Sequence, residues 1–184
     1  MNKIFYLILF VVVFACNNSI KKEDVKIDIK KYDSLIEKGT FAMKSNSIKD
    51  AISSFQEAIS IDSSKIVGYY RLGVTQGILC NQGDENYCKK ALINLKKVLD
   101  RDSNYEKISY NVGIIYFNQK KYKDALFYFN KAITKDSLDL DYYINRGFTK
   151  LNLKDTLGSC LDFKKAYHLG DNEAISLIEE FCTN

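Results

Sequence analysis

The sequence predicts an all-α protein built as a solenoid of four helix–turn–helix repeats and closed by a C-terminal capping helix. One observation is a phrase that occurs twice, as YKDALFYFNKAITKDS at 122–137 and as IKDAISSFQEAISIDS at 48–63. A second is a set of landmark residues that recurs about every 34 residues. The third is that the 184 residues include no Pro, which is typical of a chain that is helical almost throughout.

The landmarks define the repeat. The first is a Gly, spaced by 34, 40 and 34 residues: Gly39, Gly73, Gly113, Gly147. The second is a small residue, then a bulky residue four positions on and a small or β-branched residue three further on: Ala51-Phe55-Ala58, Ala91-Leu95-Val98, Ala125-Phe129-Ala132, Ser159-Phe163-Ala166. Positions i, i+4 and i+7 share one helix face, so each unit has two amphipathic helices. We expect the small residues where the helices cross closely and the bulky ones between units, with six extra residues inserted after Gly73.

The N-terminus has a different composition. Lys3 precedes an apolar run of twelve residues, 4–15, which is too short to span a bilayer and has the length of an export signal. The run ends Val13-Phe14-Ala15-Cys16, which resembles the lipobox of bacterial lipoproteins, although Phe14 departs from the usual choice. The resemblance implies that Cys16 is lipidated. Plain signal cleavage and a buried helix are the alternatives.

These features divide the chain into a signal peptide at 1–15, a lipidated Cys with a flexible tether at 16–30, and a folded domain at 31–184. The tether is polar and mixed in charge. Asn17, rather than Asp, follows Cys16. In Gram-negative lipoproteins this residue favours an outer-membrane location, so we expect a lipid-anchored protein of the cell envelope that faces the periplasm.

The repeats resemble the tetratricopeptide repeat. The residues that carry the resemblance are Tyr69 and Leu72-Gly73 in the second copy and Val112-Gly113, Tyr116, Ala125, Phe129 and Ala132 in the third. The resemblance implies a right-handed superhelix with repeats at about 32–65, 66–105, 106–139 and 140–173. The family's Pro is replaced by Ser63, Ser103, Ser137 and Asp171, which we expect to cap the next helix. Lys38, Arg146 and Lys150 occupy positions that are often apolar, where their stems can cover apolar surface.

The end of the solenoid is marked by Gly170, followed by a new helix start. Beyond it, an apolar stripe faces a polar one: Ala174, Leu177, Ile178 and Phe181 against Ser176, Glu179 and Glu180. We expect a capping helix at 172–182 that covers the last exposed face.

Four cysteines remain besides Cys16. Cys80 and Cys88 bracket the inserted residues, and Cys160 and Cys182 lie at helix ends that adjacent antiparallel helices can bring together. An even count in an exported protein favours two disulfides. Four free buried thiols are one alternative. A metal site with Asp84 and Glu85 is another, but its spacing matches no metal motif. We expect neither a metal nor a cofactor.

The resemblance also places a binding groove, because the first helices of successive units line a concave surface in this family. The implied groove residues are Ile36, Tyr70, Arg71, Val74, Ile78, Tyr110, Asn111, Ile114, Phe117, Asn118, Ile144, Asn145, Phe148 and Asn152. Most are apolar or aromatic, which favours binding of a peptide or helix, with Asn118 and Asn152 able to bond a peptide backbone. The alternative is a tightly wound superhelix in which these side chains pack on one another.

Several function classes are disfavoured. The 27 basic residues are scattered among 23 acidic ones for a net charge of +4, so no nucleic-acid stripe stands out. No phosphate-binding Gly loop, nucleophile elbow or zinc-protease motif is present, so we expect no enzyme. We expect a non-catalytic scaffold that binds a peptide or helix of a cell-envelope partner. One alternative is an assembly factor for outer-membrane or secretion machinery, and another is an accessory subunit or enzyme with a small-ligand pocket near an expected loop at 80–88.

Overall fold

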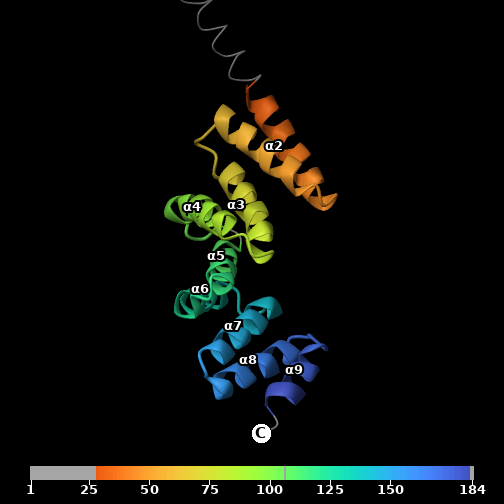
Figure 1. Ribbon diagram of the computed structural model, residues 1–184, viewed down its shortest axis with the longest axis vertical. Coiled ribbons are helices and arrows are strands. Elements are labelled where there is room, and N and C mark those ends of the chain that lie inside the picture. The colour runs from red at the N-terminus through yellow and green to blue at the C-terminus, as the bar shows by residue number, and fades with distance from the viewer. Residues whose placement is uncertain (1–27, 106, 183–184) are drawn as a thin grey trace, which may run out of the picture. The chain divides into compact units, whose positions relative to one another are not determined.

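The structure is a computed structural model that describes residues 28–105 and 107–182 (Figure 1). Within these residues it contains helices and turns and no strand, which confirms the all-α repeat fold. The expected signal peptide, Cys16 and the tether up to residue 27 lie outside the described residues. Residues 28–30, which we expected in the tether, are helical. The described part divides into two compact units, one up to Gly68 and one from Tyr69 onward.

The first unit contains a helical stretch at 28–44, α2 (Ile48–Ile61) and the start of α3. Its core includes Tyr32, Leu35 and Ala58. The Tyr32 hydroxyl accepts a hydrogen bond of 3.0 Å from the backbone N–H of Gly68. A Cβ at Gly68 would lie 2.9 Å from Ile59 Cγ1, so this close approach requires glycine.

The second unit continues with α3 (Ile66–Asn81), α4 (Glu85–Arg101), α5 (Ile108–Asn118), α6 (Tyr122–Lys135), α7 (Leu140–Asn152), α8 (Thr156–His168) and α9 (Ala174–Phe181). From α4 to α9, successive helices pack on one another (Figure 1). The expected capping helix is α9, which packs on α8.

The repeat register places the bulky landmark of every pair in the core. Phe55, Leu95, Phe129 and Phe163 are all completely buried. Each ring or side chain lies against the landmark Gly of its own repeat, and a Cβ at Gly113 would lie only 2.7 Å from Phe129 Cε1. The expected close crossing at glycine is therefore confirmed.

The six extra residues of the second repeat are helical, which corrects the expected loop at 80–88. They lengthen both helices of the pair, because α3 has 16 residues and α4 has 17, against 11 and 14 for α5 and α6. The turn is short and includes Gly83, whose φ of 95° favours glycine. Asp84 then begins α4 early, because its carboxylate accepts hydrogen bonds from the backbone N–H groups of Asn86 and Tyr87.

Aspartates close the turns that follow each of the first three repeats. Asp62, Asp102 and Asp136 each end a helix and accept a hydrogen bond at Oδ1 from the backbone N–H two residues on, at 2.8 to 2.9 Å. These bonds are Asx turns. The sequence predicted instead that Ser63, Ser103 and Ser137 cap the next helix, but the N-cap residues of α5 and α7 are Lys107 and Asp139.

Both expected cysteine pairs are at disulfide distance. Cys80 and Cys88 join the extended ends of α3 and α4, with sulfurs 2.10 Å apart. Cys160 and Cys182 join α8 to the end of the capping helix, with sulfurs 2.11 Å apart. In the chain-entropy description, loops of 8 and 22 residues stabilise the folded state by about 2.5 and about 3.4 kcal/mol.

Candidate functional site: the groove face of α3, α5 and α7

Three first helices of the second unit carry all but one of the predicted groove residues. We call these side chains the groove face: Tyr70, Arg71, Val74 and Ile78 on α3, Tyr110, Asn111, Ile114, Phe117 and Asn118 on α5, and Ile144, Asn145, Phe148 and Asn152 on α7. Ile36 belongs to the first unit, where it is half-buried against the cluster around Tyr32.

Exposure on the groove face lies between the two expectations drawn from the sequence. Tyr70 is buried, Asn152 is exposed, and the other members are half-buried. Apolar side chains that keep part of their surface in water retain a favourable free energy of burial for a partner to use. The face is therefore partly packed on itself and partly open.

A ladder of Tyr and Asn side chains links successive repeats along this face. Asn111 donates from Nδ2 to the Tyr70 hydroxyl at 3.2 Å, and Asn145 donates from Nδ2 to the Tyr110 hydroxyl at 3.1 Å. Asn145 Nδ2 also donates to the backbone carbonyl of Asp141 at 2.8 Å, so both of its amide N–H groups are used and its side-chain carbonyl oxygen is the group left for a further bond. The sequence analysis missed this ladder, although Tyr three residues before one Gly and Asn two residues before the next Gly were visible.

A hollow opens on the groove face between α3 and α5. Its volume is about 240 Å³, and its lining includes Val74, Gly77, Ile78, Tyr110 and Ile114. Gly77 deepens it, because the corresponding positions of the next two repeats carry Phe117 and Leu151. The sequence signal for the hollow is the glycine four residues after Gly73, where the next repeat has Phe117.

The two Asn residues expected to bond a peptide backbone make hydrogen bonds within the chain. Asn118 donates to the side-chain carbonyl of Asn81. Asn152 donates to the backbone carbonyl of Phe148 at 2.9 Å. Asn118 therefore fixes the end of α5 against the extended end of α3, and only Asn152 remains exposed.

Charge near the groove face gathers at the start of α7. Lys107 Nζ lies 2.5 Å from Asp139 Oδ2, and this hydrogen bond raises the pKa of Lys107. Burial, helped by the nearby carboxylates of Asp141 and Asp139, raises the pKa of Tyr110 to about 12. The ladder hydroxyl of Tyr110 is therefore neutral at physiological pH and accepts the Asn145 bond as a phenol.

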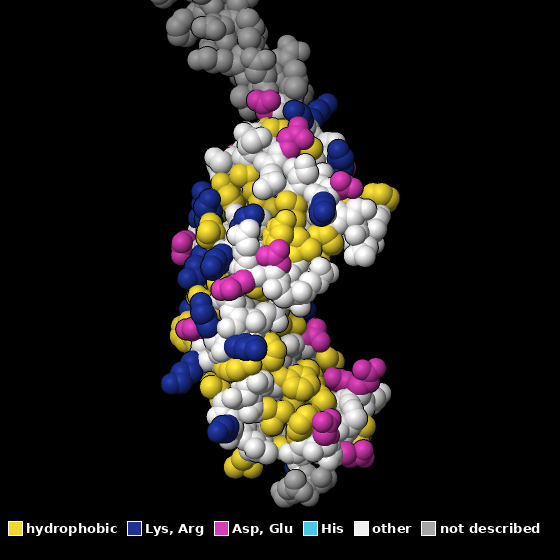
Figure 2. All heavy atoms as spheres, viewed as in Figure 1, with side chains coloured by type: hydrophobic (Ala, Val, Ile, Leu, Met, Phe, Trp, Pro, Cys, Tyr) yellow, Lys and Arg dark blue, Asp and Glu magenta, His cyan; other side chains and the backbone are white. Residues whose placement is uncertain are grey.

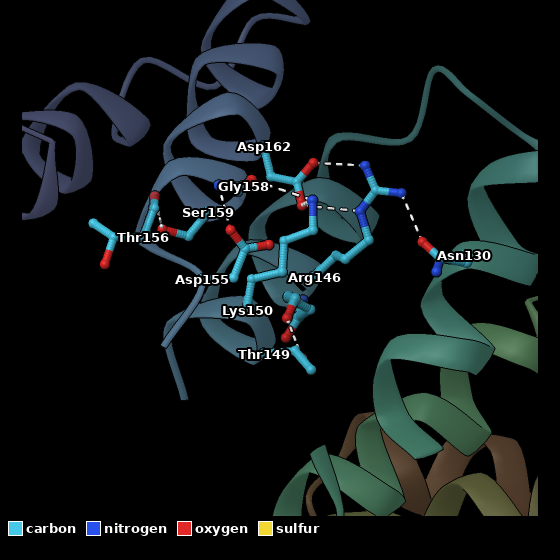
Figure 3. Close-up of polar contacts among 10 residues, drawn as sticks. Asn130, Arg146, Thr149, Lys150, Asp155, Thr156, Gly158, Ser159 and Asp162 are labelled. Atoms are coloured by element: carbon cyan, nitrogen blue, oxygen red, sulfur yellow. Dashed lines mark hydrogen bonds and ion pairs between the residues drawn. The ribbon is translucent and has the colours of Figure 1, made fainter. Parts of the chain in front are cut away.

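The fourth repeat holds a buried charge cluster that the sequence analysis did not foresee (Figure 3). Asp162, 3% exposed, accepts hydrogen bonds from Arg146 Nε at 2.9 Å and from Arg146 Nη2 at 2.6 Å. Lys150 Nζ lies 2.8 Å from the same carboxylate, and Arg146 Nη1 also donates to Asn130 of α6. The sequence predicted only that the stems of Arg146 and Lys150 cover apolar surface. In the structure, the charged ends of both side chains also bind the Asp162 carboxylate.

Two properties of the described residues bear on other classes of site. No group of three or more His, Cys, Asp or Glu side chains in the described ranges is arranged to hold a metal ion. No helix between residues 28 and 182 is long and apolar enough to cross a membrane. The hollow that reaches Asn81 opens on the groove face rather than between Cys80 and Cys88.

Comparisons with known proteins agree with this arrangement. The tetratricopeptide repeat family model matches residues 107–137, which contain α5 and α6. A comparison with curated protein sequences finds no match. Solved structures at low identity share the fold.

Three of these structures illustrate the likeness. PilF from Pseudomonas aeruginosa is 22% identical, with a TM-score of 0.68 over 83% of this chain and 70% of that one. MamA from Desulfovibrio magneticus RS-1 is 19% identical, with a TM-score of 0.67 over 75% of each chain. TTC0263, a thermophilic TPR protein in Thermus thermophilus, is 14% identical, with a TM-score of 0.69 over 94% of each chain. Residues 107–137 thus match the tetratricopeptide repeat family, and the chain shares the fold of the solved tetratricopeptide repeat structures.

Proposed function

We propose that this protein is a non-catalytic scaffold whose groove face binds a peptide or helix of a protein partner in the cell envelope. The observation that carries the proposal is the row of half-buried apolar side chains on α3, α5 and α7 around the Gly77 hollow. A side chain of the partner enters the hollow and removes Val74, Ile78 and Ile114 from water. Each Å² of apolar surface removed from water contributes roughly 25 cal/mol before the cost of association.

The ladder supplies direction and selectivity. Asn111 and Asn145 are held by hydrogen bonds to Tyr hydroxyls, and Asn145 also by one to Asp141, so their side-chain carbonyl oxygens are fixed in place beside the apolar row. A partner backbone that bonds to them loses little freedom on the protein side, because the receptor is preorganised.

Binding by this face is tested with peptides selected from a displayed random library on the purified full chain. Ile114→Asp introduces a charge beside the hollow, and we expect it to weaken binding of the selected peptides at least tenfold, about 1.4 kcal/mol. Leu138→Asp is the matched control, because Leu138 is exposed in the turn between α6 and α7 and lies off the groove face. Equal losses in both variants would contradict the proposal.

A second variant distinguishes a direct loss of peptide binding from a loss of binding caused by unfolding. Gly77→Ala adds one methyl group to the hollow, and its Cβ would lie 3.0 Å from Ile115 Cδ1. Because Ala also favours helix, we expect the thermal midpoint to stay within a few degrees while peptide affinity falls several-fold. Unchanged affinity in this variant would mean that the hollow is not used.

The anchor belongs to the same proposal. Cys16 carries lipid and holds the repeats at a bacterial membrane, most simply the outer membrane facing the periplasm. Metabolic labelling with an alkyne fatty acid in a bacterial host is expected to label the natural chain and not Cys16→Ser. A natural chain without label would remove the anchor from the proposal and leave the groove untouched. An assembly role in outer-membrane or secretion machinery stays a prediction.

A further inference from the structure

The second helices of the second unit present a repeated pattern at their solvent face. An apolar residue and a Lys lie four positions apart in three successive repeats, which places both on one side of each helix. We call this set the second-helix row: Ile93 and Lys97 on α4, Phe127 and Lys131 on α6, and Leu161 and Lys165 on α8. The first repeat has Ser53 and Glu57 at the same positions, so the pattern belongs to the second unit.

The apolar members of the row are unusually exposed. Ile93, Phe127 and Leu161 are 58%, 54% and 61% exposed. A single exposed apolar side chain needs no explanation. Three at the same position of adjacent repeats, however, form an apolar surface whose exposure to water is unfavourable.

The charge on these helices has one dominant sign. α4 carries five basic and two acidic residues, and α6 carries three basic and one acidic. The row lysines lie beside aromatic rings, with Lys97 Nζ at 4.7 Å from the Tyr69 centroid and Lys131 Nζ at 4.8 Å from the Phe127 centroid. Figure 2 shows Lys and Arg side chains gathered with hydrophobic ones along the left side, over α4 and α6.

A hollow of about 340 Å³ lies between α4 and α6 within this surface. Leu99 and Phe127 provide its apolar walls, and Lys131 and Lys135 lie at its edge. Asn104 and Asn130 add amide groups. An apolar side chain next to a carboxylate fits this combination, because the apolar walls exclude water while the lysines meet the charge.

We propose that the second-helix row is a docking surface for an acidic amphipathic segment of a protein partner, distinct from the groove face. An apolar side chain of that segment fills the hollow between Leu99 and Phe127, and its carboxylates pair with Lys97, Lys131 and Lys135. The hollow favours a protein segment over an anionic bilayer, because a bilayer surface cannot insert a single side chain between two helices.

The probe is a set of synthetic peptides that combine Leu and Glu at several helical spacings, each matched by a peptide with Lys in place of Glu. Fluorescence anisotropy measures their binding to the full chain in neutral detergent. We expect at least one acidic peptide to bind tenfold or more better than its Lys counterpart and to lose affinity as salt rises. No preference for the acidic peptides would overturn the proposal.

Variants locate the binding. Lys131→Glu and Phe127→Ser are each expected to weaken the acidic peptide about tenfold, and both residues are exposed, so folding is preserved. Lys49→Glu on α2 makes the same charge change in the unit that lacks the row, and we expect it to have little effect. Equal weakening by Lys49→Glu and Lys131→Glu would reduce the effect to net charge and overturn the proposal.

Two further outcomes would also overturn it. One is that vesicles containing phosphatidylglycerol, rather than any peptide, respond to Lys131→Glu in flotation. The other is that Phe127→Ser converts a dimer to a monomer in sedimentation, which would assign the row to a second copy of the chain. Groove variants such as Ile114→Asp are expected to leave acidic-peptide binding unchanged.

Discussion

The third and fourth repeats fill the same position between their two helices with opposite chemistry. In the third, Tyr116 of α5 stacks on Tyr128 of α6, with ring centroids 5.5 Å apart. In the fourth, the same two positions hold Lys150 and Asp162, which form an ion pair. Both repeats keep the Gly and Phe of the core register unchanged.

The other two repeats extend the comparison. The second repeat places Gln76 and Asn94 at these positions, and Asn94 donates to the Gln76 carbonyl at 2.9 Å. The first places Ala42 and Ser54 there, and a hollow of about 320 Å³ lined by both opens in that unit. The fold therefore fixes the contact between the landmark Gly and its bulky partner, whereas the two positions beside that contact differ in chemistry from repeat to repeat.

The largest expected effect tests the fixed part of this comparison. Phe129→Ala and Phe163→Ala each empty a completely buried site next to a landmark Gly, and we expect each to lower the free energy of unfolding by about 3–5 kcal/mol. Urea melts measure the loss. A loss below about 1 kcal/mol for either would contradict the shared register.

The charge cluster of the fourth repeat is expected to give the next largest change in stability. Asp162→Ala leaves Arg146 and Lys150 facing each other without their buried anion, so we expect a loss of about 3 kcal/mol. Replacing the cluster by its third-repeat counterparts, as Arg146→Val, Lys150→Tyr and Asp162→Tyr together, is expected to restore stability to within about 1 kcal/mol. Failure of this transplant would show that the two chemistries are not interchangeable.

A smaller effect is expected from the aromatic pair of the third repeat. A double-mutant cycle with Tyr116→Leu and Tyr128→Leu measures how strongly the two rings interact, and we expect about 0.5–1.5 kcal/mol. Zero coupling would mean that the stacked geometry adds nothing to burial alone.

The last effect appears only at high pH. Burial raises the pKa of Tyr110 and of Tyr142 from 10.0 to about 12. Between these values the unfolded chain releases protons that the folded chain retains, so stability falls as pH rises from about 10 to about 12. Tyr142→Phe removes one such group and is expected to make the fall in urea midpoint shallower over this range. A slope identical to the parent's would contradict the assignment.

The sequence predicted the residues that recur in every repeat, but it did not predict which side chains contact one another across two helices. Gly113 and Phe129 were predictable because the same residues recur at a fixed spacing in other copies. Lys150 and Asp162 were not, because they lie on different helices and have no counterpart of the same type elsewhere in the chain. The added residues before Ala91 were expected to form a loop, although Asp84 followed by Glu85 is a recognisable helix start.

On the candidate site, the sequence placed the residues and not their bonds. Tyr110 and Asn145 were both assigned to the groove from their offsets to Gly, and both lie there. The hydrogen bond from Asn145 to Tyr110 depends on how successive repeats are offset along the stack. A pattern of residue types at single positions carries no information about that offset. Ile36 had the correct offset but lies in the other compact unit.

The aspartate turns after α2, α4 and α6 have a kinetic consequence. A side-chain carboxylate does there what Pro does in many repeats of this kind, and the 184 residues contain no Pro at all. Isomerisation about X–Pro bonds takes roughly 10–100 s at 25 °C and often limits refolding. This chain contains no X–Pro bond, so its refolding does not include this slow step. With the disulfides kept intact, we expect neighbouring helix pairs to assemble on the faster timescale of helix docking.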